Sequence, residues 1–193
     1  MDELRKIYSD KGVGERFDFG RWPQGPNGEV EPITWRVLRR EKEFLLVTSE
    51  KGLECKPFHE SYCPVTWIDC SLRRWLDDDF YNFAFEENER SLILPARVDN
   101  NYCPATEDRI FLLSVDEAEK LFAGDDDRRA LAADFAVAKG VNTHDGFCSW
   151  WLRSRGSCEV NAADVDVAGL ICSGGGNVTY RFSAVRPALR LTL

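Results

Sequence analysis

The chain has 193 residues, 44% of them hydrophobic and 12% aromatic, which is the composition of a folded domain and excludes a disordered segment. The formal net charge of −8 argues against nucleic acid as the main partner. No apolar run approaches the ~20 residues of a membrane helix. We therefore expect one domain over residues 1–193 and, because no secretion signal is visible, a cytoplasmic protein without a membrane partner.

The N-terminal part of the chain predicts β-structure after a polar start. Residues 1–14 form either a short helix or a loose arm. Strands are expected over residues 17–23, 32–39 and 44–48, with a turn at 24–28 and a hairpin connection at 41–43. Ile33, Trp35 and Val37 occupy alternate positions and are expected to face the core.

Helical signals dominate the middle of the chain. After an irregular segment at 53–67, Ser71 is expected to cap a helix with Leu72, Trp75, Leu76, Phe80 and Phe83 near helical spacing. A second short helix is expected over 86–94, and a short buried strand over 110–113.

Two further helices are expected before the C-terminal stretch. Ser114 and Glu117 form a capping box ahead of the first. The run Asp125–Asp127 starts the second, which Gly140 closes. Strands, then helices, then strands predict an α+β domain with a mostly antiparallel, twisted sheet and flanking helices.

The C-terminal stretch, residues 149–193, combines two core-like ends with a small, polar middle. Two alternating segments, 164–167 and 177–183, flank Gly174–Gly176, which predicts a β-hairpin with the glycines at its turn. Residues expected to face the core are Val165, Val167, Val178, Tyr180 and Phe182. The opposite face would be polar and available to a ligand.

This polar display face gives the candidate ligand-binding residues. They are Ser157, Cys158, Asn161, Asp164, Asp166, Ala168, Leu170, Cys172, Ser173, Asn177, Thr179, Arg181 and Ser183. The residues expected to be structural are Trp150, Trp151, Arg153, Arg186 and Pro187. We expect the two arginines to pair with buried carbonyls or carboxylates at the base of the hairpin.

Several motifs carry a resemblance to a known family. They are Trp150–Ser154, Ala162-Ala163-x-Val165, Gly169 and Ala184–Leu189, with upstream matches at 19–24, 33–38, 72–76, 80–82 and 111–114. This pattern resembles a bacterial domain family of unknown function that reads WWLRSPG…AAxV…G…VRPAL. Arg155 stands where that family usually has Pro.

The closing pattern is also similar to the C-type-lectin fold in its formylglycine-generating-enzyme-like form. That form includes the variable proteins of diversity-generating retroelements, in which adenine-directed mutagenesis cannot create Lys, Gln, Met or Trp. No Lys, Gln or Met follows Lys139 in this chain. The resemblance implies a C-type-lectin-like domain that binds a protein or other surface ligand without catalysis and without a cofactor.

Two other functions stay open at this point. A formylglycine-generating-type oxidase would need a pair of cysteines, for which Cys158 and Cys172 are the candidates. A structural interaction domain would use the same face to pack in a larger assembly. The oligomeric state is left open.

The remaining chemistry-bearing residues favour structural explanations. Cys55, Cys63, Cys70 and Cys103, with His59, lack the paired spacing of a zinc site. His144 lies in a short turn-like segment. Asp164 and Asp166 share one predicted strand face, where a solvated surface is favoured over calcium binding.

One short motif recurs. Tyr62-Cys63-Pro64-x-Thr66 returns as Tyr102-Cys103-Pro104-x-Thr106, which is too short to define a repeat and predicts two similar loops.

Overall fold

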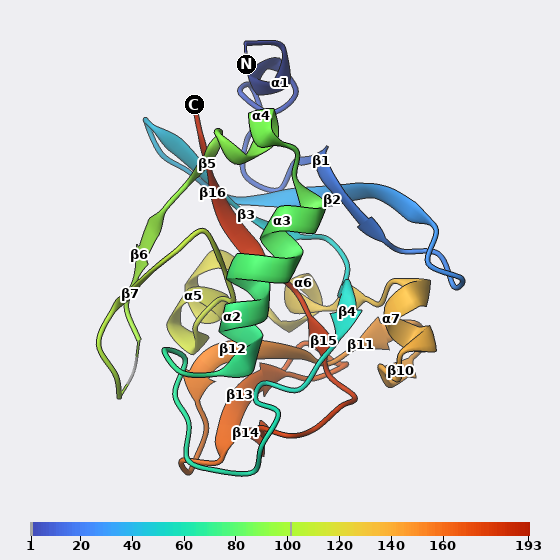
Figure 1. Ribbon diagram of the computed structural model, residues 1–193, viewed down its shortest axis with the longest axis vertical. Coiled ribbons are helices and arrows are strands. Elements are labelled where there is room, and N and C mark those ends of the chain that lie inside the picture. Colours follow the sequence, from blue (N-terminus) through green and yellow to red (C-terminus); the bar gives the residue numbers. More distant parts are fainter. Residues whose placement is uncertain (1, 101) are drawn as a thin grey trace.

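A six-stranded antiparallel sheet forms the upper part of the domain in the computed structural model, which describes residues 2–100 and 102–193 (Figure 1). Its order is β1 (Arg16–Pro23), β2 (Val30–Arg40), β3 (Phe44–Ser49), β16 (Ala188–Thr192) and β5 (Ile93–Leu94), and β8 (Ile110–Phe111) also pairs with β16. The C-terminal strand is therefore central. The Tyr8 hydroxyl donates to the Thr192 carbonyl at 3.0 Å, so the two ends of the chain lie together.

A five-stranded sheet forms the lower part (Figure 1). Its order is β14 (Ile171–Asn177), β13 (Asn161–Val165), β12 (Trp150–Arg155), β15 (Ala184–Val185) and β4 (Glu54–Cys55). The pairing of β12 with β15 is parallel and the others are antiparallel. Two smaller sheets contain β6 (Ala96–Val98) with β7 (Thr106–Asp108), and β9 (Ala130–Leu131), β10 (Thr143–His144) and β11 (Phe147–Cys148).

Short helices connect and cover these sheets, so the domain is α+β. They are α1 (Asp2–Lys6), α2 (Ser71–Trp75), α3 (Tyr81–Ala84), α4 (Glu87–Arg90), α5 (Val115–Leu121), α6 (Asp125–Arg128) and α7 (Asp134–Ala138). A π-helical turn, η1 (Leu76–Phe80), joins α2 to α3. The continuous helix α2–η1–α3 runs from the lower sheet to the upper one (Figure 1). No helix in the described part of the chain is long and apolar enough to cross a membrane.

The predicted N-terminal strands are confirmed. Ile33, Trp35 and Val37 of β2 are fully buried, and Ser114 and Glu117 make the predicted capping box at the start of α5. The N-terminal segment is the short helix α1 followed by the buried Tyr8, so the alternative of a loose arm is wrong for the described residues.

The helix predicted to start at Ser71 needs two corrections. The cap of α2 is Cys70, whose Sγ accepts from the Arg73 amide at 3.3 Å, and Ser71 is the first helical residue. Phe83 is exposed, because the extra residue of the π-turn rotates it away from the buried positions of Leu76 and Phe80.

The helix predicted over residues 125–140 is two helices. α6 ends at Arg128, and strand β9 separates it from α7. Gly140 does terminate α7, with the left-handed φ of +116° that a closing glycine supplies.

The C-terminal hairpin is present with a different turn. β13 and β14 pair antiparallel, and Gly174–Gly176 lie within β14 instead of at its turn. The turn is at residues 166–170, where Asp166 Oδ1 accepts from the amides of Ala168 and Leu170, each at 2.9 Å. Gly169 supplies the left-handed φ of +86°.

The residues after β14 do not continue the predicted alternation. Asn177 Oδ1 accepts from the amide of Thr179 at 2.9 Å, which turns the chain out of the sheet. Tyr180 and Phe182 are therefore exposed, contrary to prediction, and Val167 is only half-buried. Ser183, predicted to face outward, is 1% exposed because the chain returns to β15 there.

Candidate recognition site

The strands β12 and β16 form a rigid frame for the lower end of the molecule. Trp150 and Trp151 are fully buried, and the Trp151 indole donates to the Lys56 carbonyl at 3.0 Å. The buried Pro187 carbonyl accepts from the Ser49 amide at 2.9 Å. These contacts fix where the loops that leave the frame begin and end.

Both predicted structural arginines hold carbonyls, as expected. Arg186 Nε donates to the Ser49 carbonyl at 2.9 Å and its Nη1 to the Arg128 carbonyl at 3.1 Å. Complete burial lowers the pKa of Arg186 to about 10. Arg153 donates to the Leu112 carbonyl at 2.8 Å and pairs with the Glu117 carboxylate.

Three of the four loops that we call the rim lie at the lower end of the molecule in Figure 1, and the fourth, between β6 and β7, lies at the left. The four loops are residues 59–66, 102–106, 155–160 and 178–182. The Val65 amide donates to the Glu159 carbonyl at 3.0 Å, and the His59 amide donates to the Val178 carbonyl at 2.8 Å. Segments more than ninety residues apart in sequence are thus joined by backbone hydrogen bonds.

An open cleft of about 250 Å³ lies within the rim. Its lining residues are Pro64, Val65, Thr66, Asp69, Tyr102, Arg155 and Glu159. The Arg155 guanidinium carbon lies 4.9 Å from the centre of the Tyr102 ring, a cation–π contact across the cleft. Thr66 Oγ1 is buried without a hydrogen-bond partner among the described residues, which leaves a polar group available on the cleft's lining.

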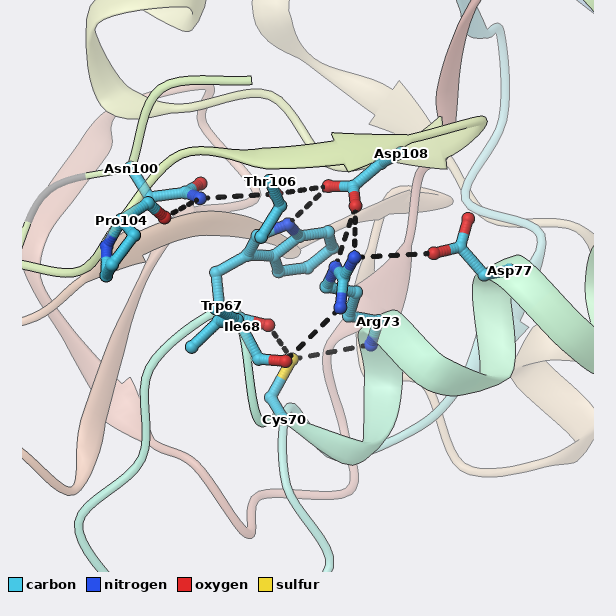
Figure 2. A network of polar contacts seen from close by, with 9 residues as sticks. All are labelled: Trp67, Ile68, Cys70, Arg73, Asp77, Asn100, Pro104, Thr106 and Asp108. Carbon is cyan, nitrogen blue, oxygen red and sulfur yellow. Dashed lines mark hydrogen bonds and ion pairs between the residues drawn. The ribbon is translucent and has the colours of Figure 1, made fainter. Parts of the chain in front are cut away.

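A buried polar network fixes the two loops that flank this cleft (Figure 2). The Asp108 carboxylate accepts from the Trp67 indole and from the Thr106 hydroxyl, each at 2.8 Å. It also accepts from Arg73 Nε at 2.7 Å, which ties both loops to α2. Burial and the nearby Asp108 charge raise the pKa of Asp77, which lies 3.8 Å from Arg73.

The recurring Tyr-Cys-Pro-x-Thr motif is the sequence signal for this site. Pro64 and Thr66 come from its first copy and Tyr102 from its second, and all three line the same cleft. Tyr102 has a φ of 67°, a left-handed conformation that a tyrosine rarely adopts. Such outliers concentrate at functional sites, where the surroundings hold them in place.

Aromatic side chains are unusually exposed on the rim. Tyr102 is 76% exposed, Tyr62 68%, Tyr180 43% and Phe182 38%. The Tyr180 and Phe182 rings lie 4.7 Å apart, and between them Arg181 pairs with Glu60 of another rim loop. Exposed aromatic residues on a rigid support are the usual anchors of recognition surfaces.

The structure divides the predicted ligand-binding residues among several places. Ser157, Cys158, Thr179 and Arg181 lie on the rim, with Asn161 and Asn177 at the strand ends beside it. Asp166, Ala168 and Leu170 lie at the opposite end of the hairpin, in its turn, whereas Asp164, Cys172 and Ser173 lie along the strands. Ser183 is buried and belongs to the frame. The prediction of a single continuous face is therefore wrong.

Asp164 and Cys172 face each other across β13 and β14. Burial, and secondarily the charge of Asp166, raises the pKa of the Asp164 carboxyl to about 6. Burial and these two carboxylates also raise the pKa of the Cys172 thiol. Because thiolate formation is favoured by the opposite environment, these surroundings favour the thiol form of Cys172.

The candidate metal ligands are placed apart or used otherwise. His59 Nδ1 accepts from the Ser71 amide at 3.1 Å, and Cys70 caps α2. His144 is exposed, at a distance of 3.7 Å from the Asp145 carboxylate. Within residues 2–100 and 102–193, no group of three or more His, Cys, Asp or Glu side chains is arranged to hold a metal ion.

Comparison with protein families assigns the chain. It belongs to the family described as Domain of unknown function (DUF6273), whose model matches residues 42–193 and so includes the whole rim. No curated protein and no solved structure matches the chain significantly.

Proposed function

We propose that this domain is a non-catalytic recognition module that binds a protein through the rim. The observation that carries the proposal is the exposure of four aromatic side chains on the rim loops, one of which, Tyr102, lines the cleft. Such rings bury a large area on binding and lose little conformational entropy, because each has only two rotatable side-chain bonds.

The rigidity of the support adds to this argument. The Asp108 network and the backbone bonds between loops hold the rim in place before a partner arrives, which reduces the entropy lost on binding. The net charge of −8 favours a protein over nucleic acid as the partner.

We further propose that the fold is a variant of the C-type-lectin fold. The adjacent chain ends and the loop-rich lower sheet support this assignment. In retroelement variable proteins of this kind, a frame supports a surface that tolerates many residues. Here, nothing lies within 4 Å of a Cβ built at Gly174, and Ser157 and Cys158 are exposed, so this part of the chain can accept substitutions.

Sequencing of the surrounding DNA tests the retroelement proposal. A near-copy of the region encoding residues 150–187, differing only where the copy has adenine, would support a diversified surface. A neighbourhood of several kilobases without such a copy would contradict it.

A matched pair of variants tests recognition by the rim. The rim variant carries Tyr62→Ser, Tyr102→Ser, Tyr180→Ser and Phe182→Ser. The control carries serine at four apolar residues exposed elsewhere, namely Val13, Val30, Leu131 and Val137. The wild-type protein and the two variants are each immobilised and used to capture partners from a lysate of the source cells. Each band that the wild type captures is then quantified for both variants.

We expect a specific band that the wild type and the control retain and the rim variant loses at least tenfold. Circular dichroism should show that all three proteins are folded. Equal capture by the rim variant and the wild type would contradict the proposal. An oxygen-consuming activity lost in Cys172→Ser would favour the oxidase alternative, and a partner lost only in the control would favour a structural interaction elsewhere.

A further inference from the structure

A second cavity, which shares no lining residue with the cleft, lies beside α5 and the central strand β16. It has a volume of about 230 Å³ and is lined by Arg97, Asp99, Ser114, Asp116, Glu117, Arg153 and Arg190. Three arginines therefore line this polar cavity, and Arg153 is the one predicted site residue among its lining.

Arg190 is the least satisfied of these arginines. Among the described residues, no carboxylate lies within 4 Å of it and its guanidinium donates no hydrogen bond. Its guanidinium makes a cation–π contact with Phe44, whose ring centre lies 4.7 Å from the guanidinium carbon. Burial lowers the pKa of Arg190, and the charges of Arg39 and Arg153 act in the same direction while Glu117 opposes them.

Arg153 adds a second unused donor. Its side chain is 3% exposed and its Nη atoms are bonded, but its Nε is buried without an acceptor. Arg190 Nε is buried and unpaired as well. A buried donor without a partner is unfavourable, and both of these donors belong to residues that line the cavity.

The carboxylates of the cavity do not fill this role. Glu117 is engaged by Arg153 and by the Ser114 amide, at 2.9 Å from the latter. Asp99 lies 3.8 Å from Arg97, where both side chains are highly exposed, and Asp116 is exposed. The Ser114 hydroxyl oxygen accepts from the Glu117 amide, which leaves its proton free to be donated.

We propose that this cavity binds a small oxyanion, a carboxylate or phosphate group, through Arg190, Arg153 and the Ser114 hydroxyl. The planar guanidinium fork matches two oxygens of such a group, and charge-assisted hydrogen bonds of this type are stronger than neutral ones. Arg97, on the exposed wall, supplies additional positive charge. The site is independent of the proposed rim function.

Thermal unfolding in different anions tests this site. The melting temperature of the intact chain is measured in millimolar sodium phosphate, sodium acetate and sodium chloride at equal ionic strength. We expect a saturable rise of several degrees with phosphate or acetate over chloride, because a ligand that binds only the folded state stabilises it. The anion that gives the larger rise in melting temperature shows whether the ligand carries a phosphoryl or a carboxylate group. Calorimetric titration with that anion should give one site per chain.

The key variant is Arg190→Met, which keeps an unbranched stem against Phe44 and removes the charge and the donors. It should abolish the anion-dependent rise without lowering the melting temperature in chloride. The matched control is Arg39→Met, which removes a nearby charge outside the cavity and should leave the response intact. Arg97→Gln, on an exposed side chain that cannot unfold the core, should weaken the response severalfold.

Two results would overturn the proposal. One is a wild-type response equal in all three salts. The other is an anion response of Arg190→Met that equals the wild-type response. If Arg190→Met fails to fold, the same test applies to Arg97→Gln. Either match would assign the rise in melting temperature to general salt effects on the surface.

Discussion

The frame and two of the four rim loops come from the same C-terminal stretch, yet their aromatic residues are used in opposite ways. Trp150 and Trp151 of β12 are fully buried, and the Trp151 indole nitrogen has a hydrogen-bond partner. Tyr180 and Phe182, some thirty residues later, expose their rings beside the Arg181–Glu60 ion pair. The buried aromatic side chains of the frame therefore stabilise the fold, whereas the exposed rings of the rim remain available to a partner.

The difference follows from where the backbone hydrogen bonds lie. β12 pairs on both sides, with β13 and β15, so its side chains lie between packed layers. The chain after Asn177 leaves the sheet, and its amides bond to turns and to neighbouring loops instead. A segment held by its backbone alone can carry side chains that contribute little to folding.

The largest expected effect is the difference between alanine substitutions of one aromatic residue in the frame and one on the rim. Trp151→Ala should lower the free energy of unfolding by about 3–5 kcal/mol, because it leaves a cavity and an unpaired Lys56 carbonyl. Tyr102→Ala should change it by less than about 0.5 kcal/mol, the usual range for exposed positions. Urea unfolding of both variants checks this, and equal losses would show that the rim belongs to the core.

A smaller difference in stability is expected between alanine substitutions at two neighbouring glycines of β14. Gly175 has a φ of +65°, and a Cβ there would overlap the Ala162 carbonyl, so Gly175→Ala should cost about 2–3 kcal/mol. Nothing lies within 4 Å of a Cβ at Gly174, so Gly174→Ala should be nearly neutral. Thermal denaturation of both variants measures the difference, and a neutral Gly175→Ala would mean that β14 pairs in another register.

The third prediction concerns Asp164 and pH. Because its pKa is raised to about 6 in the folded state, the folded protein holds this proton more tightly than the unfolded chain. Its contribution to stability is therefore complete below the unfolded pKa of about 4 and is lost as the pH rises through 6.

Asp164→Asn removes this dependence. We expect a gain of about 1–2 kcal/mol at pH 7, after allowance for solvent screening of the half-buried group, and almost none at pH 4. Urea unfolding at the two pH values measures it, with Asp79→Asn on the exposed side of η1 as the control. A gain of equal size at both pH values would contradict the role given to ionisation.

Sequence patterns predicted the N-terminal strands and the start of α5 well, because these features depend on local periods and caps. The alternation of Ile33, Trp35 and Val37 and the capping box at Ser114 depend on neighbours in sequence, and both are confirmed. The α+β class follows from the same local signals. The π-turn at 76–80 has no comparable signal, so the exposure of Phe83 was missed.

The candidate site was predicted less well, because it depends on contacts between distant segments. Three glycines in a row read as a turn, although a glycine within a strand also marks a close approach, as at Gly175. The true turn signal was the Asp166 side chain followed by Gly169. The repeated Tyr-Cys-Pro-x-Thr motif was visible, but only the fold brings its two copies to one cleft.

The most direct test of the rim is site-specific photo-crosslinking in the source cells. A photoreactive phenylalanine analogue replaces Tyr102 or Phe182 on the rim, and Val13 or Val30 as exposed controls. The account predicts one adduct of the same protein from both rim positions and none from the controls. Adducts at the control positions with none at the rim would contradict it.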